Sequence, residues 1–251
     1  MIKQDNWIRA QCETPTHIYR KQLGTIEYAS HPFTKEQEYW SKIQTEFPTS
    51  LDVSPQGEDF FKCPSVDPIT PEELSNWKPM IHPFTSKNLR CDESGNRIIS
   101  KGLSSFGYDV TLGNKFKIFT NINGGVIDPL NMPDNCYADF EGESCIIPPN
   151  SYLLGYTVEY FHIPDDVVVV CVGKSTLARA GLLINVTPIE PGFQGQVVIE
   201  ISNLTNLPVK VYANQGVAQF LFYQGSERCS TSYADKKGKY QNQTGITTAK
   251  V

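Results

Sequence analysis

Residues 171–222 read CVGKSTLARAGLLINVTPIEPGFQGQVVIEISNLTNLPVKVYANQGVAQFLF. They follow a run of four valines at 167–170, and apolar and polar residues alternate from 196 to 202. Because side chains point alternately to the two faces of a strand, Val198 and Glu200 share one face. Both runs predict β-strands, and Glu200 places one carboxylate inside an otherwise apolar strand.

The segment GKSTLAR, at 173–179, predicts a short helical turn directly after the valine-rich strand. Ser175 is the expected N-cap, and Gly181 is the expected stop. Free amide groups at the start of such a turn, beside Lys174, favour an anion. Arg179 lies four residues after Ser175 and therefore projects from the same face of the turn.

The residues alone leave two interpretations of Glu200 open. It is either neutralised by a structural salt bridge, with Arg179 as the partner, or it is a carboxyl whose pKa is raised by apolar neighbours and which carries a proton. The segment IEPGFQG at 189–195 is equally ambiguous. It is either a β-turn or, beside a sugar, a source of a carboxylate from Glu190 and a ring from Phe193.

Composition limits the class of protein. The 251 residues carry a formal net charge of -5, with a pI near 5.4, which argues against a general binder of nucleic acid or membrane surfaces. The longest apolar run, 167–172, is too short to span a bilayer, and the N-terminus lacks the apolar core of a signal peptide. We therefore expect a soluble, cytoplasmic protein.

Cysteine and histidine spacing gives no sign of a zinc site. The seven cysteines are widely spaced without a C-x-x-C pair, which is typical of reduced thiols. The four histidines likewise show no spacing typical of zinc ligands.

Short strands dominate the chain after residue 101. Turn-forming residues separate runs expected to be strands at 115–119, 144–147, 152–161, 167–172, 183–186, 196–202, 209–212 and 217–223. This pattern predicts a mainly β sandwich, jelly roll or barrel. Nearer the N-terminus, 35–47 and 71–77 have helical spacing, and 48–68 is loop-like. The polar residues at 232–251 have no apolar periodicity, so composition alone predicts a disordered tail.

Several motifs resemble those of the dCTP deaminase family of the dUTPase superfamily. They are GKSTLARAGL at 173–182, IEPGFQG at 189–195 and VIEISN at 198–203, with SSFGYDV at 104–110, QGVAQ at 215–219 and YADKKGKYQNQ at 233–243 in the family's order. The resemblance covers about residues 80–251, together with DNWIR at 5–9. It implies a single domain, 1–251, with a distorted jelly-roll β-barrel, a partly helical insertion at 10–69 and a C-terminal lid at 232–251.

The resemblance also implies an enzyme of pyrimidine deoxynucleotide metabolism that hydrolyses dCTP to dUTP and ammonia. It implies a homotrimer with active sites between subunits, Mg²⁺ carried by the nucleotide triphosphate, no zinc, and no nucleic-acid or membrane partner. Glu200 matches the general base and acid. Arg179 matches the residue that orients Glu200 and the water, and Ser175 matches the residue that helps to place that water.

Further positions match the substrate-binding residues of the family. Lys174 and Thr176 match the phosphate site, Glu190 the ligand of the 3′-hydroxyl, and Phe193 the ring beside the deoxyribose. The pyrimidine edge would be read by the backbone of Asn185, Val186, Thr187 and Pro188. The remaining positions, in the late strand motif and the lid that closes over the triphosphate, are Gln219, Tyr233, Lys239, Tyr240 and Gln243.

Four departures from the family pattern keep alternatives open. Lys174 replaces a more usual arginine, Glu190 replaces an aspartate, the loop after Thr187 is short, and the insertion is long. The alternatives are a deaminase that prefers 5-methyl-dCTP and yields dTTP, and a bifunctional enzyme that also releases pyrophosphate. A nucleotide-binding regulator without chemistry is a third alternative, which the intact set of Ser175, Arg179 and Glu200 disfavours.

Overall fold

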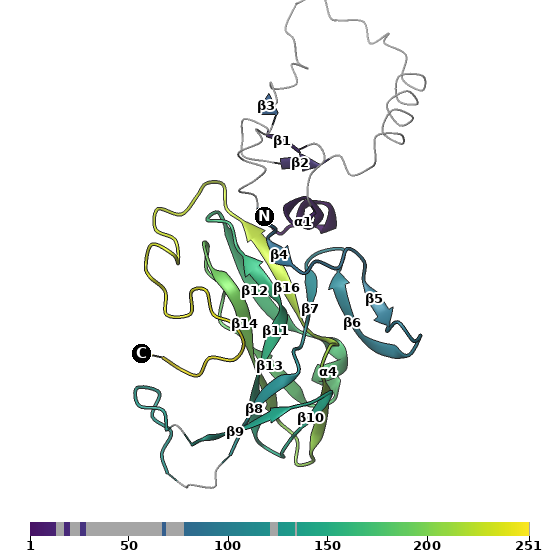
Figure 1. Cartoon of the computed structure of the whole chain (residues 1–251), viewed down its shortest axis with the longest axis vertical. Helices are drawn as coiled ribbons and strands as arrows, with labels where there is room; N and C mark the ends of the chain where they lie inside the picture. The colour runs from purple at the N-terminus through teal and green to yellow at the C-terminus, as the bar shows by residue number, and fades with distance from the viewer. Residues whose placement is uncertain are drawn as a thin grey trace, which may run out of the picture. The chain divides into compact units, whose positions relative to one another are not determined.

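The computed structural model describes residues 1–13, 18–20, 26–28, 67–68, 78–120, 125–133 and 135–250. The chain divides into two compact units, Met1–Cys12 with Pro79–Val251, and Glu13–Lys78 (Figure 1). In the second unit three short antiparallel strands pair in the order β2-β1-β3, with bounds β1 Ile18–Arg20, β2 Ile26–Tyr28 and β3 Asp67–Pro68. The helices predicted at 35–47 and 71–77 lie outside the described residues.

The first unit is built on two large antiparallel sheets. One has the order β13-β14-β11-β8-β9, with β4 also paired to β11; its bounds are β4 Ile81–His82, β8 Lys115–Phe119, β9 Tyr137–Glu141, β11 Tyr152–His162, β13 Leu182–Asn185 and β14 Gln194–Asn203. The other has the order β12-β16-β7-β6-β5, with bounds β5 Leu89–Cys91, β6 Arg97–Leu103, β7 Tyr108–Thr111, β12 Val167–Gly173 and β16 Gly216–Gln224. A separate pair joins β10 Ser144–Ile147 to β15 Val209–Tyr212.

The core lies between the inner faces of the two large sheets. Along β14 buried and half-buried residues alternate, so Ile199 and Ile201 are fully buried while Glu200 is not. Phe161 of β11 and Phe220 of β16 meet with ring centroids 5.2 Å apart. Side chains that interdigitate from two antiparallel sheets form one apolar layer. The predicted mainly β fold is confirmed, and two sheets around one core are the arrangement of a jelly roll.

Helix α1, Asp5–Cys12, packs against this core through Ile8 and Cys12. The chain leaves the first unit after α1 and returns near Met80, whose N–H donates to the Gln11 carbonyl at 2.8 Å. The chain therefore leaves the first unit and re-enters it at adjacent points of that unit, which is how a fold accommodates an inserted segment. The insertion was expected to begin at Ala10, but Ala10 is buried within α1.

Helix α4, Ser175–Arg179, follows β12 as expected, but its cap differs from the prediction. The N-cap is Lys174, which keeps the extended backbone of β12, and no side chain caps the helix. The prediction of Ser175 as N-cap is wrong because Ser175 already belongs to the helix. Gly181, at φ +79°, directly follows the C-cap and confirms the predicted stop.

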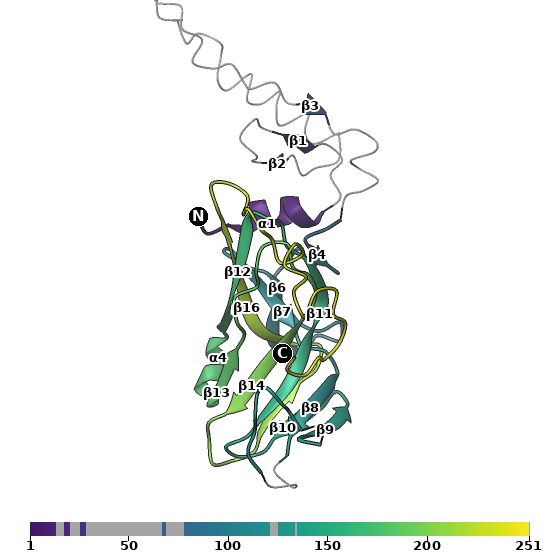
Figure 2. The ribbon, with the colours of Figure 1, turned by 90° about the vertical axis from the view of Figure 1, so that its left-hand side faces the viewer.

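The C-terminal segment 232–250, which belongs to the first unit, is folded against the strands of that unit. Figure 2 shows this segment, in yellow, passing over the sheet that contains β11 and β14. The prediction of a disordered tail from composition is wrong. Hydrogen bonds of polar side chains and backbone groups hold the segment in place, and composition shows no apolar stripe that would have signalled this. In the described part of the chain, no helix has the length and apolar character needed to cross a membrane.

Candidate active site

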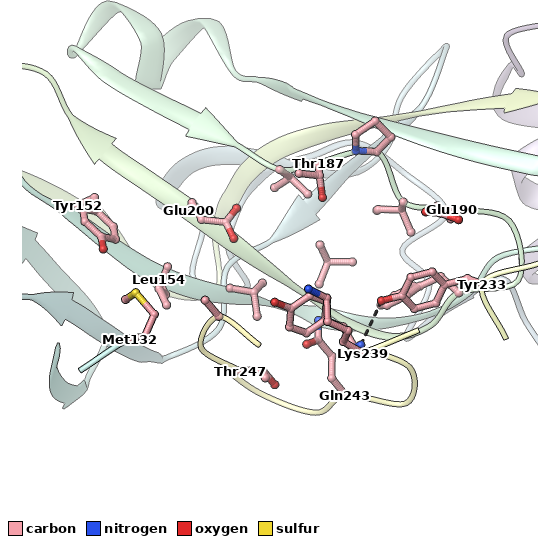
Figure 3. Close-up of a pocket in the computed structure, with 18 of the residues that line it drawn as sticks. Met132, Tyr152, Leu154, Thr187, Glu190, Glu200, Tyr233, Lys239, Gln243 and Thr247 are labelled. Carbon is pink, nitrogen blue, oxygen red and sulfur yellow. Dashed lines mark hydrogen bonds between the residues drawn. The ribbon is translucent and has the colours of Figure 1, made fainter. Parts of the chain in front are cut away.

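A pocket of about 590 Å³ opens between β11, β14, the loop after β13 and the C-terminal segment (Figure 3). The loop is held at its far end by a two-way backbone pairing of Ile189 with Val169 of β12. Both large sheets therefore position the pocket walls. Val186, Thr187 and Pro188, expected to read the pyrimidine edge, line this pocket.

Glu200 enters the pocket from the middle of β14. Its register partners are Leu154 on β11 and Asn185 on β13, so pairing on both sides fixes its backbone. Burial raises the pKa of the Glu200 carboxyl to about 7, because a low-dielectric environment disfavours the charged form. No salt bridge to Glu200 is found among the described residues. The structural ion pair with Arg179, one of the two interpretations open from sequence, is not formed in this chain.

One end of the pocket is apolar and aromatic. Figure 3 places Tyr152, Leu154 and Met132 together on one side of Glu200. The hydroxyl of Tyr152 lies 3.0 Å from that of Tyr137, which also lines the pocket. Burial raises the pKa of the Tyr137 phenol far above its ordinary value, and the bond to Tyr152 adds to this effect. The Tyr137 phenol is therefore a neutral hydrogen-bonding group at this end.

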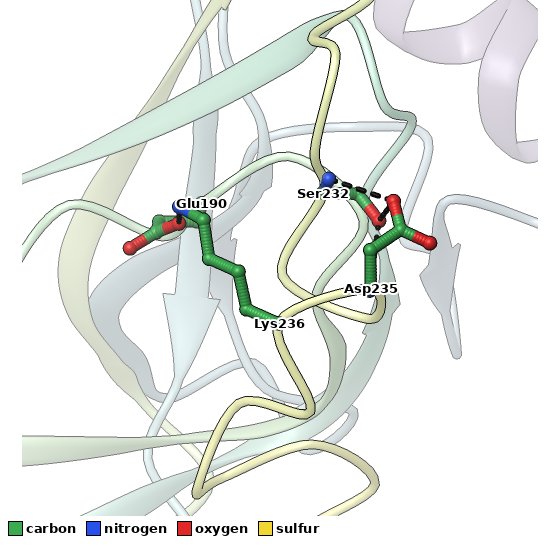
Figure 4. Close-up of polar contacts among 4 residues, drawn as sticks. All are labelled: Glu190, Ser232, Asp235 and Lys236. Atoms are coloured by element: carbon green, nitrogen blue, oxygen red, sulfur yellow. Dashed lines mark hydrogen bonds and ion pairs between the residues drawn. The ribbon is translucent and has the colours of Figure 1, made fainter.

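The opposite end carries the pair expected to meet the sugar, Glu190 and Phe193. The Phe193 ring packs against Tyr233 of the C-terminal segment, with centroids 5.8 Å apart. A Glu190 Oε2 atom lies 2.7 Å from Lys236 Nζ (Figure 4). A carboxylate and an aromatic ring thus both line this end of the pocket, and these are the groups expected to meet a deoxyribose.

The C-terminal segment closes the remaining side of the pocket. Gln243 pairs with Gly195 in a parallel bridge, and its carbonyl accepts the Gln196 N–H at 3.0 Å. The Gln243 side chain donates to the Gln196 carbonyl at 2.7 Å. Tyr240 N–H donates to the Tyr233 hydroxyl at 3.1 Å, the bond drawn as a dashed line in Figure 3. These bonds hold Lys239, Tyr240 and Gln243 against the pocket.

A second group of expected site residues lies around α4, outside this pocket. Lys174 Nζ is 2.6 Å from Asp109 Oδ2 in a largely buried ion pair. The same Asp109 oxygen accepts hydrogen bonds from Asn88 Nδ2 and Ser100 Oγ. Arg179 Nη1 donates to the Ser175 carbonyl at 3.2 Å, and both residues are exposed. The predicted common face for Ser175 and Arg179 is therefore present.

The expected site residues thus fall into two sets. Those that line the pocket are Val186, Thr187, Pro188, Glu190, Phe193, Glu200, Tyr233, Lys239, Tyr240 and Gln243. Those that do not are Lys174, Ser175, Thr176, Arg179, Asn185 and Gln219. Gln219, on β16, instead donates its side-chain N–H to the Phe106 carbonyl at 3.3 Å. One chain therefore presents the Glu200 carboxyl without the serine and arginine expected beside it, and that pair without a carboxyl.

Comparison with known proteins adds the deciding observation. A family model described as dCTP deaminase-like matches residues 80–225. The chain belongs to this family.

Two members of the dCTP deaminase-like family illustrate the similarity. The dCTP deaminase of Campylobacter jejuni subsp. jejuni serotype O:6 is 55% identical over 174 residues, which cover 69% of this chain and 91% of the relative. That of Campylobacter fetus subsp. fetus is 57% identical over 179 residues, covering 71% and 94%. A crystal structure of 2′-deoxycytidine 5′-triphosphate deaminase from Agrobacterium tumefaciens matches with a TM-score of 0.41 and 18% identity, over 49% of this chain and 40% of that one.

Sequence reasoning missed the apolar end of this dCTP deaminase-like site. Tyr137, Tyr152, Leu154 and Met132 line the pocket but carry no motif. A signal existed for Leu154, because β11 was expected as a strand and Leu154 is the register partner of Glu200. To identify Leu154 as a pocket residue, one must know that two strands about 45 residues apart are paired, and periodicity alone does not predict this pairing.

Proposed function

We propose that the chain is a dCTP deaminase, which hydrolyses the C4 amino group of dCTP to give dUTP and ammonia. The observation that carries this proposal is Glu200, a carboxyl with a pKa raised to about 7 and aimed into the pocket. Close relatives over nine-tenths of their length bear the name dCTP deaminase. The sugar-matching end and the closing C-terminal segment give the pocket the size and polarity for a deoxynucleotide.

In the proposed mechanism Glu200 handles the proton in both halves of the reaction. Its carboxylate takes a proton from the water whose oxygen forms a bond to C4. The protonated carboxyl then gives this proton to the amino nitrogen, the C4–N bond breaks, and ammonia leaves. The proton that remains on the C4 oxygen moves to N3, which gives the C4 carbonyl of dUTP. A group with a pKa near 7 serves as base and acid at neutral pH. Closure by the C-terminal segment would exclude bulk water.

We further propose that the working site lies between two copies of the chain in a homotrimer. The α4 set of one copy would bring Ser175 and Arg179 to Glu200 of the next, so that the two incomplete sets complete each other. Exposed leucines near α4 support a contact there, since Leu183, Leu204 and Leu207 are between 51% and 67% exposed. Exposed apolar patches on soluble proteins commonly mark such contacts.

The triphosphate would lie near Lys239 and near Arg179 of the neighbouring α4. Mg²⁺ would arrive bound to the phosphate oxygens and reduce their charge. Among the described residues no group of three His, Cys, Asp or Glu side chains is arranged to hold a metal. Thr176, exposed on α4, is available to a phosphate oxygen.

A second candidate is a deaminase that prefers 5-methyl-dCTP and yields dTTP. The apolar end formed by Met132, Tyr152 and Leu154 favours it, because C5 adjoins the C4 atom that would face Glu200. A methyl group there would be removed from water, which is worth about 0.8 kcal/mol for one carbon. Equal or poorer turnover of 5-methyl-dCTP relative to dCTP would reject this candidate.

The test is product analysis of the full chain with dCTP, 5-methyl-dCTP, dUTP and CTP, with and without Mg²⁺. We expect ammonia from the deoxycytidine nucleotides, and little from CTP. Pyrophosphate is assayed in the same reactions, since its release from dUTP would indicate the bifunctional enzyme. Absence of ammonia from both deoxycytidine nucleotides would contradict the proposed function.

A further inference from the structure

The loop and the C-terminal segment meet closely beside the sugar-matching end of the pocket. Tyr233 N–H donates to the Pro191 carbonyl at 2.8 Å. A Cβ atom added at Gly192 would lie 2.7 Å from Ser232 Cβ, so only glycine permits this approach. Gly192 also has φ +80°, a conformation that favours glycine. The segment is therefore fitted to the loop that carries Glu190.

A turn in the C-terminal segment sets the position of Lys236. Ser232 N–H and Oγ both donate to Asp235 Oδ2, at 2.8 and 2.7 Å, and Asp235 N–H donates back to Ser232 Oγ (Figure 4). This is the reciprocal pattern of a capping box. Lys236 N–H then donates to the Ser232 carbonyl at 3.1 Å. The backbone that presents Lys236 is thus fixed before its side chain meets Glu190.

The ion pair between Lys236 and Glu190 is too exposed to serve stability. The two side chains are 52% and 44% exposed, and exposed pairs contribute roughly 0–1 kcal/mol or nothing measurable. What the contact does fix is orientation. Lys236 binds Oε2 of Glu190, and no hydrogen bond or ion pair to Oε1 is found in the described part of the chain.

Orientation matters here because glutamate replaces the aspartate more usual in this family. The extra methylene gives the carboxylate another rotatable bond, and ordering such a side chain costs entropy. A lysine that holds one oxygen removes part of that cost before a nucleotide binds.

We propose that Lys236 is a positioning residue for deoxyribose recognition, holding Glu190 so that its other oxygen accepts the substrate's 3′-hydroxyl. Lys236 lies in the C-terminal segment that closes the site and also holds Glu190. The position of that segment is therefore linked to recognition of the 3′-hydroxyl. This inference rests on the proposed function, in which Glu190 contacts the 3′-hydroxyl.

The test compares dCTP with 2′,3′-dideoxy-CTP in Lys236→Met and in the matched variant Lys237→Met. Lys237 is the adjacent residue, is exposed, and has no ion pair among the described residues. We expect Lys236→Met to raise KM for dCTP about tenfold, as for loss of one charge-assisted hydrogen bond, with kcat nearly unchanged. Turnover of the dideoxynucleotide should change little, so the preference for a 3′-hydroxyl shrinks by the same factor. Lys237→Met should keep the full preference, and Lys236→Arg should restore most of it.

Two further measurements separate this inference from other outcomes. Glu190→Gln should lose the preference for dCTP over 2′,3′-dideoxy-CTP. The double variant Glu190→Gln, Lys236→Met should lose no more than the single variant, because both changes break the same interaction. If Lys236→Met raised KM equally for dCTP and 2′,3′-dideoxy-CTP, or changed neither KM, the inference would be overturned. If the parent protein releases no ammonia at all, the proposed function fails; equilibrium binding of dCTP and 2′,3′-dideoxy-CTP to the same variants still tests the role of Lys236.

Discussion

Glu200 and Glu159 carry two carboxyls whose pKa values are shifted in the same direction but whose surroundings differ. Burial raises both pKa values to about 7. Glu159 is only 2% exposed and accepts the Thr111 N–H at 2.9 Å, away from the pocket. Glu200 faces the pocket. A raised pKa marks a candidate, but only the geometry of β14 gives one of the two access to a substrate.

Glu200→Gln should reduce kcat by at least ~10²–10⁴-fold, the contribution of a positioned proton carrier. The amide has nearly the same shape, so nucleotide binding and folding should persist. Ammonia release and calorimetric binding of dCTP measure the two effects. Glu159→Gln is the matched control, since the amide oxygen can still accept the Thr111 N–H and activity should be retained. Substantial turnover by Glu200→Gln would contradict the assigned role.

The same two carboxyls predict how stability depends on pH. Folding raises each pKa from 4.5 to about 7, so between these values the folded state binds more protons than the unfolded chain. The free energy of unfolding should therefore be greatest, for these groups, below pH 4.5 and fall as pH rises through about 7. Thermal unfolding from about pH 5 to about pH 8 should show a flatter decline in the Glu159→Gln, Glu200→Gln double variant. An unchanged slope would contradict the burial of these groups.

At the scale of elements, periodicity predicted the strands whose two faces differ. The bounds of β8, β10 and β15 agree with the expected ranges, and the other expected strands differ by a few residues at either end. β9 was missed because its residues are nearly all exposed, with no alternation to detect. The N-cap of α4 was predicted one residue too late. Lys174, the actual N-cap, forms an ion pair with Asp109, and a contact between such distant segments cannot be found from local sequence.

The pairing of the C-terminal segment with β14 depends on Gly195. This residue has φ +146°, and an added Cβ would lie 3.1 Å from both the N and O atoms of Gln243. Gly195→Ala should displace the segment and raise KM for dCTP about tenfold or more, the cost of losing one to two hydrogen bonds.

Gly95→Ala is the control for backbone strain at Gly195. Gly95 also has a positive φ, but nothing lies near an added Cβ. Steady-state kinetics and limited proteolysis of the C-terminal segment would report the difference. Equal KM values for the two variants would show that the pairing has no part in binding.

At the scale of the whole molecule, the site itself could be assigned from sequence only in part. Ordered motifs identified Glu200, Glu190 and Phe193, which do meet in one pocket. In the proposed homotrimer, whether Arg179 faces Glu200 would depend on how copies of the chain assemble, which no local sequence pattern encodes. Within one chain the arginine is exposed and bonded only to its own helix among the described contacts.

The central claim is that Glu200 and Arg179 act together from different chains, and mixed oligomers test it most directly. Glu200→Gln and Arg179→Ala are each expected to be inactive alone. The two variants would be co-expressed with different tags, and oligomers containing both would be purified and assayed for ammonia release. In a trimer that contains both variants, about one site in three would combine an intact Glu200 with an intact Arg179 from its neighbour. Activity near that fraction of wild type is the predicted result, and mixed oligomers without activity would contradict the claim.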